Sequence, residues 1–355
     1  AVRAAAQALA KRHGFSLGHV YSRALEGFSA RLNAKQLRAL RADTRVAYIE
    51  QDLPMFVLGG PVQAQAKPGG SSTAPAAQVL PWGIDRVEAD ISSTLAGNGS
   101  GSVSGVRAYI IDTGIDTAHK DLAVLKHVNF AGGVNKDCHG HGTHVAGTVA
   151  AKDNSQDVVG VAPGVSLVGV KVLGCSGSGT TSGVIAGVDW VTANAQLPAV
   201  ANMSLGGGAS QALDEAVQKS AAAGIFYAVA AGNEGKDACL GSPARAGAGT
   251  DNGVMTTAAT DSANKEASFS NFGSCVDIWA PGVGILSTKK GGGSTTFSGT
   301  SMASPHAAGA AALYLGSNPS ASPVQLEAVL RQAAILPGTL SKNGQPIELL
   351  QVGSF

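Results

Sequence analysis

The stretch "VRAYIIDTGID", residues 106–116, runs from apolar side chains into a carboxylate and a glycine turn. Its first seven residues form the near-continuous apolar run that is typical of a strand buried on both faces. Similar runs follow at 165–173, 199–205, 225–231 and 254–260, and helical patterns alternate with them at 142–151, 180–195, 209–223 and 301–315. This alternation predicts an α/β fold, with a doubly wound, mostly parallel sheet and helices on both faces.

The bulk composition excludes several classes of protein. The chain has 355 residues, of which 44% are hydrophobic, so it can bury a sizeable core and form about two domains. A formal net charge of +1 gives no reason to expect a nucleic acid or an anionic membrane surface as partner. We find no run of about 18 apolar residues, and therefore expect no membrane span.

Residues 59–77, "GGPVQAQAKPGGSSTAPAA", have the composition of a flexible linker and divide the chain into two parts. The front part, residues 1–58, is predicted as helix 4–13, strands 17–22 and 26–32, helix 34–42 and strand 45–50, which suggests a small α+β unit. It carries nine Lys/Arg and four Asp/Glu, whereas residues 78–355 carry fifteen and twenty. The two parts therefore have opposite net charge.

Three polar residues lie where such a fold collects reactive groups. Asp112 ends the first apolar run, and Asn233 follows run 225–231 in "AAGNEG", so both are expected at carboxyl ends of strands. Ser301 begins a helix in "GTSMASPH", where the helix dipole favours a developing oxyanion. Taken singly, Asp112 could equally cap a turn, and a turn asparagine and an N-cap serine are the simpler interpretations of the other two.

Five motifs together resemble the subtilisin-like serine proteases, in particular the proteinase K and aqualysin branch. They are "YIIDTGID", "HGHGTHVAGTVAA", "NMSLGG", "AAGNEG" and "GTSMASPHAAG", in that order within residues 78–320. Their order of aspartate, histidine and serine is that of subtilisin, whereas an α/β-hydrolase has another order and needs G-x-S-x-G. Met302 and Ala303 follow Ser301, so the α/β-hydrolase interpretation fails.

The resemblance implies a domain organisation and an activity. The front part, which ends in "VAYIEQD", resembles the ferredoxin-like inhibitory propeptide of this family. Residues 1–58 would then be an intramolecular inhibitor, 59–77 a linker, and 78–355 the peptidase domain. The implied protein is a secreted, self-processing serine endopeptidase and a monomer, with no organic cofactor. The family's first propeptide strand and a signal peptide are expected to be missing from this sequence.

The stretch "CHGHGTHVAG", residues 138–147, contains three histidines. By the family's motif, His141 is the catalytic base, which takes the proton from Ser301 while Asp112 orients its ring. His144 is expected to be structural and His139 to be solvated. A zinc site would need three or four convergent ligands, and no HExxH motif supports one.

The resemblance also implies how substrate is bound. The Asn233 side-chain amide and the Ser301 N–H would form the oxyanion hole. Segments "CSGSG" (175–179) and "SLGG" (204–207), otherwise plain loops, would clamp an extended peptide through its backbone, which implies broad specificity. A roomy apolar pocket implies a preference for apolar or aromatic residues before the cut. The implied substrate-binding residues are Gly177, Ser178, Gly179, Ser204, Leu205, Gly206, Ala230 and Gly232.

The four cysteines fit two disulfides formed in an oxidising compartment, and their spacing allows three pairings. The resemblance pairs Cys138 with Cys175 and Cys239 with Cys275.

Relatives in the family bind calcium, and the matching ligands here are the Asp277 carboxylate and the backbone carbonyls of Asn252 and Val254. Extra residues near 245–249 lie beside this site. Asp85 and Glu88 could serve a second calcium site, although surface carboxylates are the simpler interpretation.

Two other classes of function remain open at this point. One is a catalytically inactive relative that serves as a binding module, although all of the implied triad positions are filled. The other is a secreted metal-binding protein built on "CHGHGTH". A covalent serine-hydrolase probe separates them, because only an active protease is labelled at Ser301.

Overall fold

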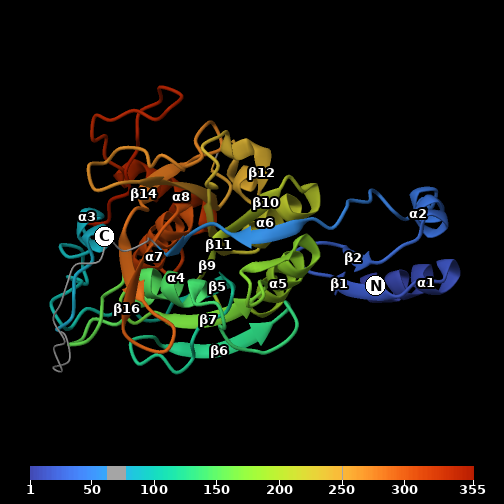
Figure 1. Ribbon diagram of the computed structural model, residues 1–355, viewed down its shortest axis with the longest axis horizontal. Helices are drawn as coiled ribbons and strands as arrows, with labels where there is room; N and C mark the ends of the chain where they lie inside the picture. The colour runs from blue at the N-terminus through green and yellow to red at the C-terminus, as the bar shows by residue number, and fades with distance from the viewer. Residues whose placement is uncertain (62–76, 250) are drawn as a thin grey trace.

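A computed structural model describes residues 1–61, 77–249 and 251–355. Its central feature is a seven-stranded parallel sheet with the strand order β14-β13-β11-β9-β5-β7-β6 (Figure 1). The strands are β5 (Arg107–Asp112), β6 (Val124–Asn129), β7 (Ser166–Lys171), β9 (Ala199–Met203), β11 (Ile225–Ala230), β13 (Val254–Thr260) and β14 (Ile278–Pro281). The predicted α/β fold class is confirmed.

Helices cover both faces of this sheet, and this is why its central strands are apolar throughout. Helices α4 (His141–Ala150) and α7 (Thr300–Ser317) pack on one face, and α5 (Thr181–Asn194) and α6 (Gln211–Ala222) on the other. Along β5, Ala108 and Ile110 contribute to the core under α4 and α7, while Tyr109 and Ile111 contribute to the core under α5 and α6.

Two strands of this central sheet and two helices were not predicted from the sequence. Strands β6 and β14 are the edges of the sheet, where half-exposed or short segments give no continuous apolar run. Pro281 ends β14, as expected for an edge strand, which can tolerate the missing N–H. Helices α3 (Trp82–Arg86) and α8 (Pro323–Ala333) were also not predicted, although Ser322 caps α8 through a capping box with Gln325.

The front part contains α1 (Val2–His13), β1 (Leu17–Tyr21), β2 (Gly27–Ala30) and α2 (Ala34–Arg41). It projects to one side of the main body, with β1 and β2 as an antiparallel pair (Figure 1). The predicted strand 45–50 is wrong, because this segment pairs with no other strand. It runs instead towards the surface of the main body, where Tyr48 donates a hydrogen bond to Glu215 (3.0 Å) on α6.

Three further carboxylates attach the front part to the rest of the chain. Asp189 on α5 accepts hydrogen bonds at Oδ1 from the backbone N–H groups of residues 22, 23 and 24, at 3.0, 2.6 and 2.9 Å. Asp52 accepts from Ser182 N (2.8 Å) at the start of α5, and Glu50 accepts from Gln211 N (2.8 Å) at the start of α6. Unpaired N–H groups and the helix dipole make both helix starts favourable places for a carboxylate.

Residues 54–61 enter two small sheets whose other strands belong to the main body. Strand β3 (Pro54–Val57) lies between β8 (Ser178–Thr180) and β10 (Leu205–Gly208), and β10 also pairs with β12 (Gly241–Ser242). Strand β4 (Gly60–Pro61) pairs with β16 (Ser294–Ser298), which in turn pairs with β15 (Ile285–Thr288). The sequence assigned residues 60 and 61 to the linker; residues 62–76 of that linker lie outside the described ranges.

Two disulfides join loops around the central sheet. Cys138 pairs with Cys175 and Cys239 with Cys275, at sequence separations of 37 and 36 residues. Closing loops of this length restricts the unfolded chain and stabilises the fold by about 4 kcal/mol each on a chain-entropy model. Within the described ranges, no helix has the length and apolar character needed to cross a bilayer.

Candidate active site

An aspartate and a histidine form a buried hydrogen-bonded pair at the carboxyl edge of the sheet. Asp112 is the last residue of β5, and His141 is the first residue of α4. His141 Nδ1 and Asp112 Oδ1 are 2.8 Å apart, and both side chains have an exposed fraction of 0%. Thr113 N also donates to Asp112 Oδ1 (2.6 Å). Within the described part of the chain, His141 Nε2 is buried without a partner, so this nitrogen is free to accept a proton.

The start of α4 is held by Asp137, a residue that the sequence analysis did not identify. The cap residue Gly140 has no side chain to satisfy the first N–H groups of the helix. Asp137 supplies this function: it accepts from Gly140 N (2.7 Å) and from Thr143 N (3.0 Å). Thr113 Oγ1 donates to Asp137 (3.0 Å) and accepts from Gly142 N (2.9 Å), which ties the Asp112 turn to the His141 helix. A carboxylate shortly before a helix start is the sequence signal that could have revealed Asp137.

Ser301 lies in the first turn of α7. Its backbone N–H donates to the carbonyl oxygen of Leu58 (3.0 Å), and its hydroxyl donates to the carbonyl oxygen of Ser204 (2.9 Å). The preceding Gly299 has a φ of +151°, and a side chain there would collide with the Leu58 carbonyl and Gly59. Only glycine therefore permits this approach of the front part to the helix start.

The Leu58 carbonyl oxygen has a second donor, the side chain of Asn233. The distance from Asn233 Nδ2 to Leu58 O is 2.6 Å. Thr300 orients the Asn233 amide, because its N–H and its hydroxyl donate to Asn233 Oδ1 at 2.9 and 2.8 Å. Two hydrogen-bond donors thus converge on one carbonyl oxygen, which is the arrangement that stabilises an oxyanion at that atom.

Residues 54–58 fill the cleft beside these groups. Strand β3 pairs antiparallel with β10, with Val57 opposite Leu205 and Met55 opposite Gly207, and with β8, with Met55 opposite Gly179. Its side chains alternate: Met55 is 0% exposed, whereas Phe56 is 49% exposed. The residues that the sequence proposed as a peptide clamp at 177–179 and 204–206 therefore lie against the chain's own segment.

Leu58 enters a space bordered by Gly206. A Cβ at Gly206 would lie 2.8 Å from Leu58 Cδ1, so the missing side chain makes room for this leucine. Ala230 ends β11 and is buried, and Gly232 N donates to Thr300 Oγ1 (3.2 Å), which places Gly232 beside the group that orients Asn233.

The other two histidines of the motif differ in environment. His144 is fully buried: its Nε2 lies 3.0 and 3.1 Å from the carbonyl oxygens of Ile285 and Thr295, and its ring stacks on Phe297. Burial, with a contribution from nearby His141, lowers the pKa of His144 to about 3, so the ring is neutral. The expectation that His139 is solvated is wrong: it is half-buried, and its Nδ1 is buried without a partner among the described residues.

The residues expected to bind calcium are only partly arranged for it. A Cβ at Gly247 would lie 2.7 Å from the Val254 carbonyl oxygen and 2.8 Å from Asp277 Oδ2, so these two oxygens face one small space. Asp277 is 8% exposed, and burial raises its pKa well above the usual value. No group of three or more His, Cys, Asp or Glu side chains in the described ranges could hold a metal, so backbone oxygens would have to complete the site.

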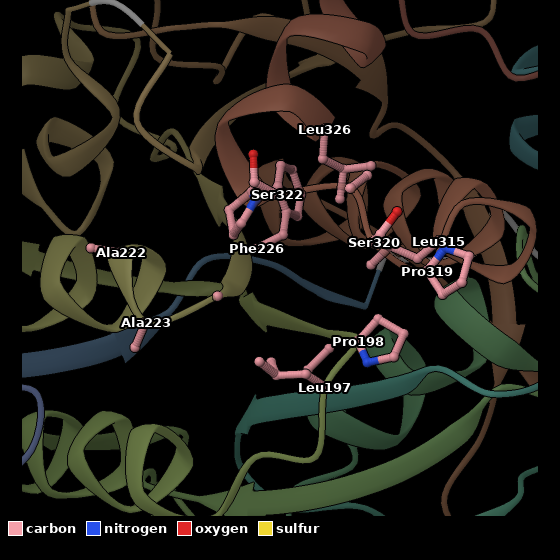
Figure 2. A pocket seen from close by; sticks show the side chains of 14 residues that line it. Leu197, Pro198, Ala222, Ala223, Phe226, Leu315, Pro319, Ser320, Ser322 and Leu326 are labelled. Carbon is pink, nitrogen blue, oxygen red and sulfur yellow. The ribbon is translucent and has the colours of Figure 1, made fainter.

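A separate groove lies away from these residues, near the amino-terminal ends of β9 and β11 (Figure 2). Its volume is about 330 Å³, and it is lined by small and apolar residues such as Leu197, Phe226 and Leu326. It contains two serines but no titratable side chain, so it offers no acid or base that could activate a nucleophile. The cleft occupied by residues 54–58 is therefore the candidate active site.

The fold and the site together define a protein of the serine peptidase class. A family model described as "Subtilase family" matches residues 104–354, and one described as "Peptidase inhibitor I9" matches residues 2–57. The chain belongs to the subtilase family and carries the inhibitor I9 propeptide domain in front of its peptidase domain.

Relatives agree with this assignment. The chain is 46% identical over 338 residues to "Alkaline serine exoprotease A" of Vibrio alginolyticus, covering 93% of this chain but only 59% of that protein. It is 43% identical to "Extracellular serine proteinase" of Thermus sp. (strain Rt41A), covering 89% of this chain and 73% of that protein. A solved structure, "Crystal structure of a cold adapted subtilisin-like serine proteinase", is 44% identical, with a TM-score of 0.68, and the match covers 78% of this chain and 99% of that one.

The buried state of His144 yields a pH-dependent prediction. Its pKa in the fold is about 3, below the usual 6.5, so between these values the unfolded chain binds a proton that the folded chain does not. The contribution of His144 to stability is therefore present above pH 6.5 and is lost as the pH falls. His144→Ala should be less stable than the parent at pH 7, and the gap in unfolding free energy should narrow by about 1 kcal/mol per pH unit below 6.5.

The measurement is denaturant unfolding of both proteins between pH 7 and pH 4.5, each in a Ser301→Ala background to suppress self-digestion. The difference between the two cancels the contributions of other titrating groups. A gap that stays constant with pH would show that His144 does not titrate as described.

Proposed function

We propose that this chain is the precursor of a secreted endopeptidase that first cuts its own Leu58–Gly59 bond. The observation that carries this proposal is the position of the Leu58 carbonyl oxygen, which accepts hydrogen bonds from Asn233 Nδ2 (2.6 Å) and Ser301 N (3.0 Å). The carbonyl carbon of Leu58 is thereby held beside Ser301, the proposed nucleophile. Two disulfides are consistent with an extracellular destination.

The chemistry is an acyl transfer. Ser301 Oγ leaves its hydrogen bond to Ser204, gives its proton to His141 Nε2 and attacks the Leu58 carbonyl carbon. Asp112 holds the ring through Nδ1 and stabilises the imidazolium, while Asn233 and the Ser301 N–H stabilise the oxyanion. His141 then returns the proton to the nitrogen of Gly59 as the C–N bond breaks. Water hydrolyses the Leu58 ester by the same steps and regenerates Ser301.

The same cleft supports broad specificity with an apolar preference at the residue before the cut. Strand β3 is held on both sides by backbone pairing, which any sequence can form. The side chain before the cut meets the open space at Gly206, where a leucine fits. Foreign proteins would enter this cleft once residues 54–58 have left it, so the front part acts as an inhibitor until then.

Self-cleavage can be followed in two variants and a control. Ser301→Ala should leave the intact chain, and His141→Ala should slow cleavage by at least about 10²–10⁴-fold, the usual contribution of a general base. Ser304→Ala is the matched control on the next turn of α7: its hydroxyl donates to Asn202 Oδ1 (2.8 Å), and it should still be processed. N-terminal sequencing of the first product of the parent should find Gly59.

Two results would contradict this proposal. Normal processing of Ser301→Ala would remove the catalytic assignment. A first product that begins at residues 76–78 would instead show that the first cut falls near Ala77, and the segment at Leu58 would then be an inhibitor without being the first substrate.

We also propose that a calcium ion, held by the Asp277 carboxylate and the backbone carbonyls of Asn252 and Val254, stabilises the fold. The support is the donor chemistry, since carboxylate and carbonyl oxygens suit calcium, and the space that Val254 O and Asp277 Oδ2 share at Gly247. The ion would have no part in the chemical steps.

Asp277→Asn should therefore lower the unfolding temperature in calcium-containing buffer by several degrees, because a ligand that binds only the folded state stabilises it by mass action. The substitution retains an acceptor for Thr256 N, which now donates to Asp277 Oδ2 (2.7 Å). Asp90→Asn is the control for loss of one carboxylate. Identical thermal unfolding of the parent in calcium and in EDTA would refute the proposal.

A further inference from the structure

His139 is a polar side chain at the active site that the catalytic steps do not use. It lies two residues before His141, and the two rings have centroids 6.2 Å apart. His139 is half-buried, and within the described ranges its Nδ1 is buried without a hydrogen-bond partner. A buried unpaired ring nitrogen costs free energy, so its presence at a substrate cleft needs an explanation.

The second residue before the cut borders the same space as His139. That residue is Val57 in β3, and its N–H donates to the Gly177 carbonyl oxygen (3.0 Å). A Cβ at Gly177 would lie 2.9 Å from His139 Nε2 and 3.2 Å from Val57 Cγ2. The imidazole and the Val57 side chain are therefore neighbours across a gap kept open by a glycine, and a longer side chain at position 57 would extend towards the ring.

Four charged or titratable groups act on the ring of His139. His141 and Lys290 disfavour a positive charge on its ring, and Asp112 and Asp137 favour one. Lys290 lies at this loop, since its ammonium donates to the Cys138 carbonyl oxygen (2.7 Å). Both carboxylates are already engaged, Asp112 with His141 and Asp137 with the start of α4. A carboxylate arriving from a substrate would meet the imidazole and, nearby, the Lys290 ammonium.

We propose that His139 is a specificity-determining residue, which in its protonated form favours substrates with an acidic side chain at the second residue before the cleaved bond. This inference rests on the proposed function, because it takes residues 54–58 as a substrate. The chain's own segment has a valine, Val57, at this position and so would not benefit from the preference. Foreign substrates with glutamate or aspartate there would be cleaved faster, relative to such a neutral sequence, as the pH falls.

The pH dependence follows from the state of the ring. Burial, with a contribution from His141, lowers the pKa of His139 below its usual value, so the ring is neutral at pH 8. An acidic substrate side chain favours the protonated ring. The advantage of an acidic over a neutral substrate side chain through His139 is therefore absent well above this pKa, and it grows as the pH falls through the pKa.

The test uses the processed, active protein and two peptides that differ only in glutamate or glutamine before the leucine at the cut. The ratio of their kcat/KM values is measured from pH 8.5 to pH 5.5, because protonation of His141 slows both peptides and cancels in the ratio. The ratio should rise about two- to fivefold between pH 8.5 and pH 5.5, the size of an ion pair in partial contact with water. His139→Asn should give a flat ratio, and His139→Lys, with a charge that does not titrate here, should favour glutamate throughout.

A flat ratio in the parent, or the same rise in His139→Asn, overturns the inference. Hydrolysis of the glutamine peptide is the separate readout of the proposed function: if neither peptide is cut, the function itself fails. If His139→Asn does not fold, the comparison of the parent with His139→Lys decides, since only the parent should change its ratio with pH.

Discussion

The register of strand β3 between β8 and β10 determines which bond of the chain lies beside Ser301 and the other proposed catalytic groups. Side chains on a strand alternate between faces, so a shift of one residue would exchange every inward and outward position. In the observed register Met55 is buried and Phe56 is exposed. A one-residue shift would expose Met55 and remove the Leu58 carbonyl from its two donors. Backbone pairing thus holds the segment in the cleft, and the alternation of its side chains fixes the register and therefore the bond that is cut.

The proposed catalytic pair, Asp112 and His141, depends in turn on a buried polar network at the carboxyl edge of the sheet. Asp112 ends β5 and His141 begins α4, and neither element alone fixes the distance between them. Thr113 and Asp137 join the two ends, and Lys171 donates to the carbonyl oxygens of Thr113 and Leu173, each at 2.8 Å. A buried ammonium is costly unless its protons are satisfied, so this lysine holds the ends of β5 and β7 in one arrangement.

Much of this site could be predicted from the sequence, because its residues lie in contiguous motifs at strand ends and helix starts. The central strands were predictable because burial on both faces leaves an unbroken apolar run. The contacts between distant segments were not. Nothing in the sequence of residues 45–50 indicates that they contact the surface of α6 and do not form a third strand. Likewise, nothing in "CHGHGTH" distinguishes a solvated His139 from one that faces Val57. Both features depend on which distant segments come into contact in the fold, and local sequence patterns do not predict such contacts.

The front part of the chain also shows why net charge is a poor guide to such contacts. It is positive overall, yet two of its few acidic residues, Glu50 and Asp52, make the hydrogen bonds to the starts of α6 and α5. A two-stranded sheet is marginally stable alone, and Tyr21 at the end of β1 is buried in the same core as the residues of α5. Docking on the peptidase therefore contributes to the folding of the inhibitor itself. Cutting after Leu58 would break one covalent link and leave these contacts in place, so inhibition would end only when the front part is removed or digested.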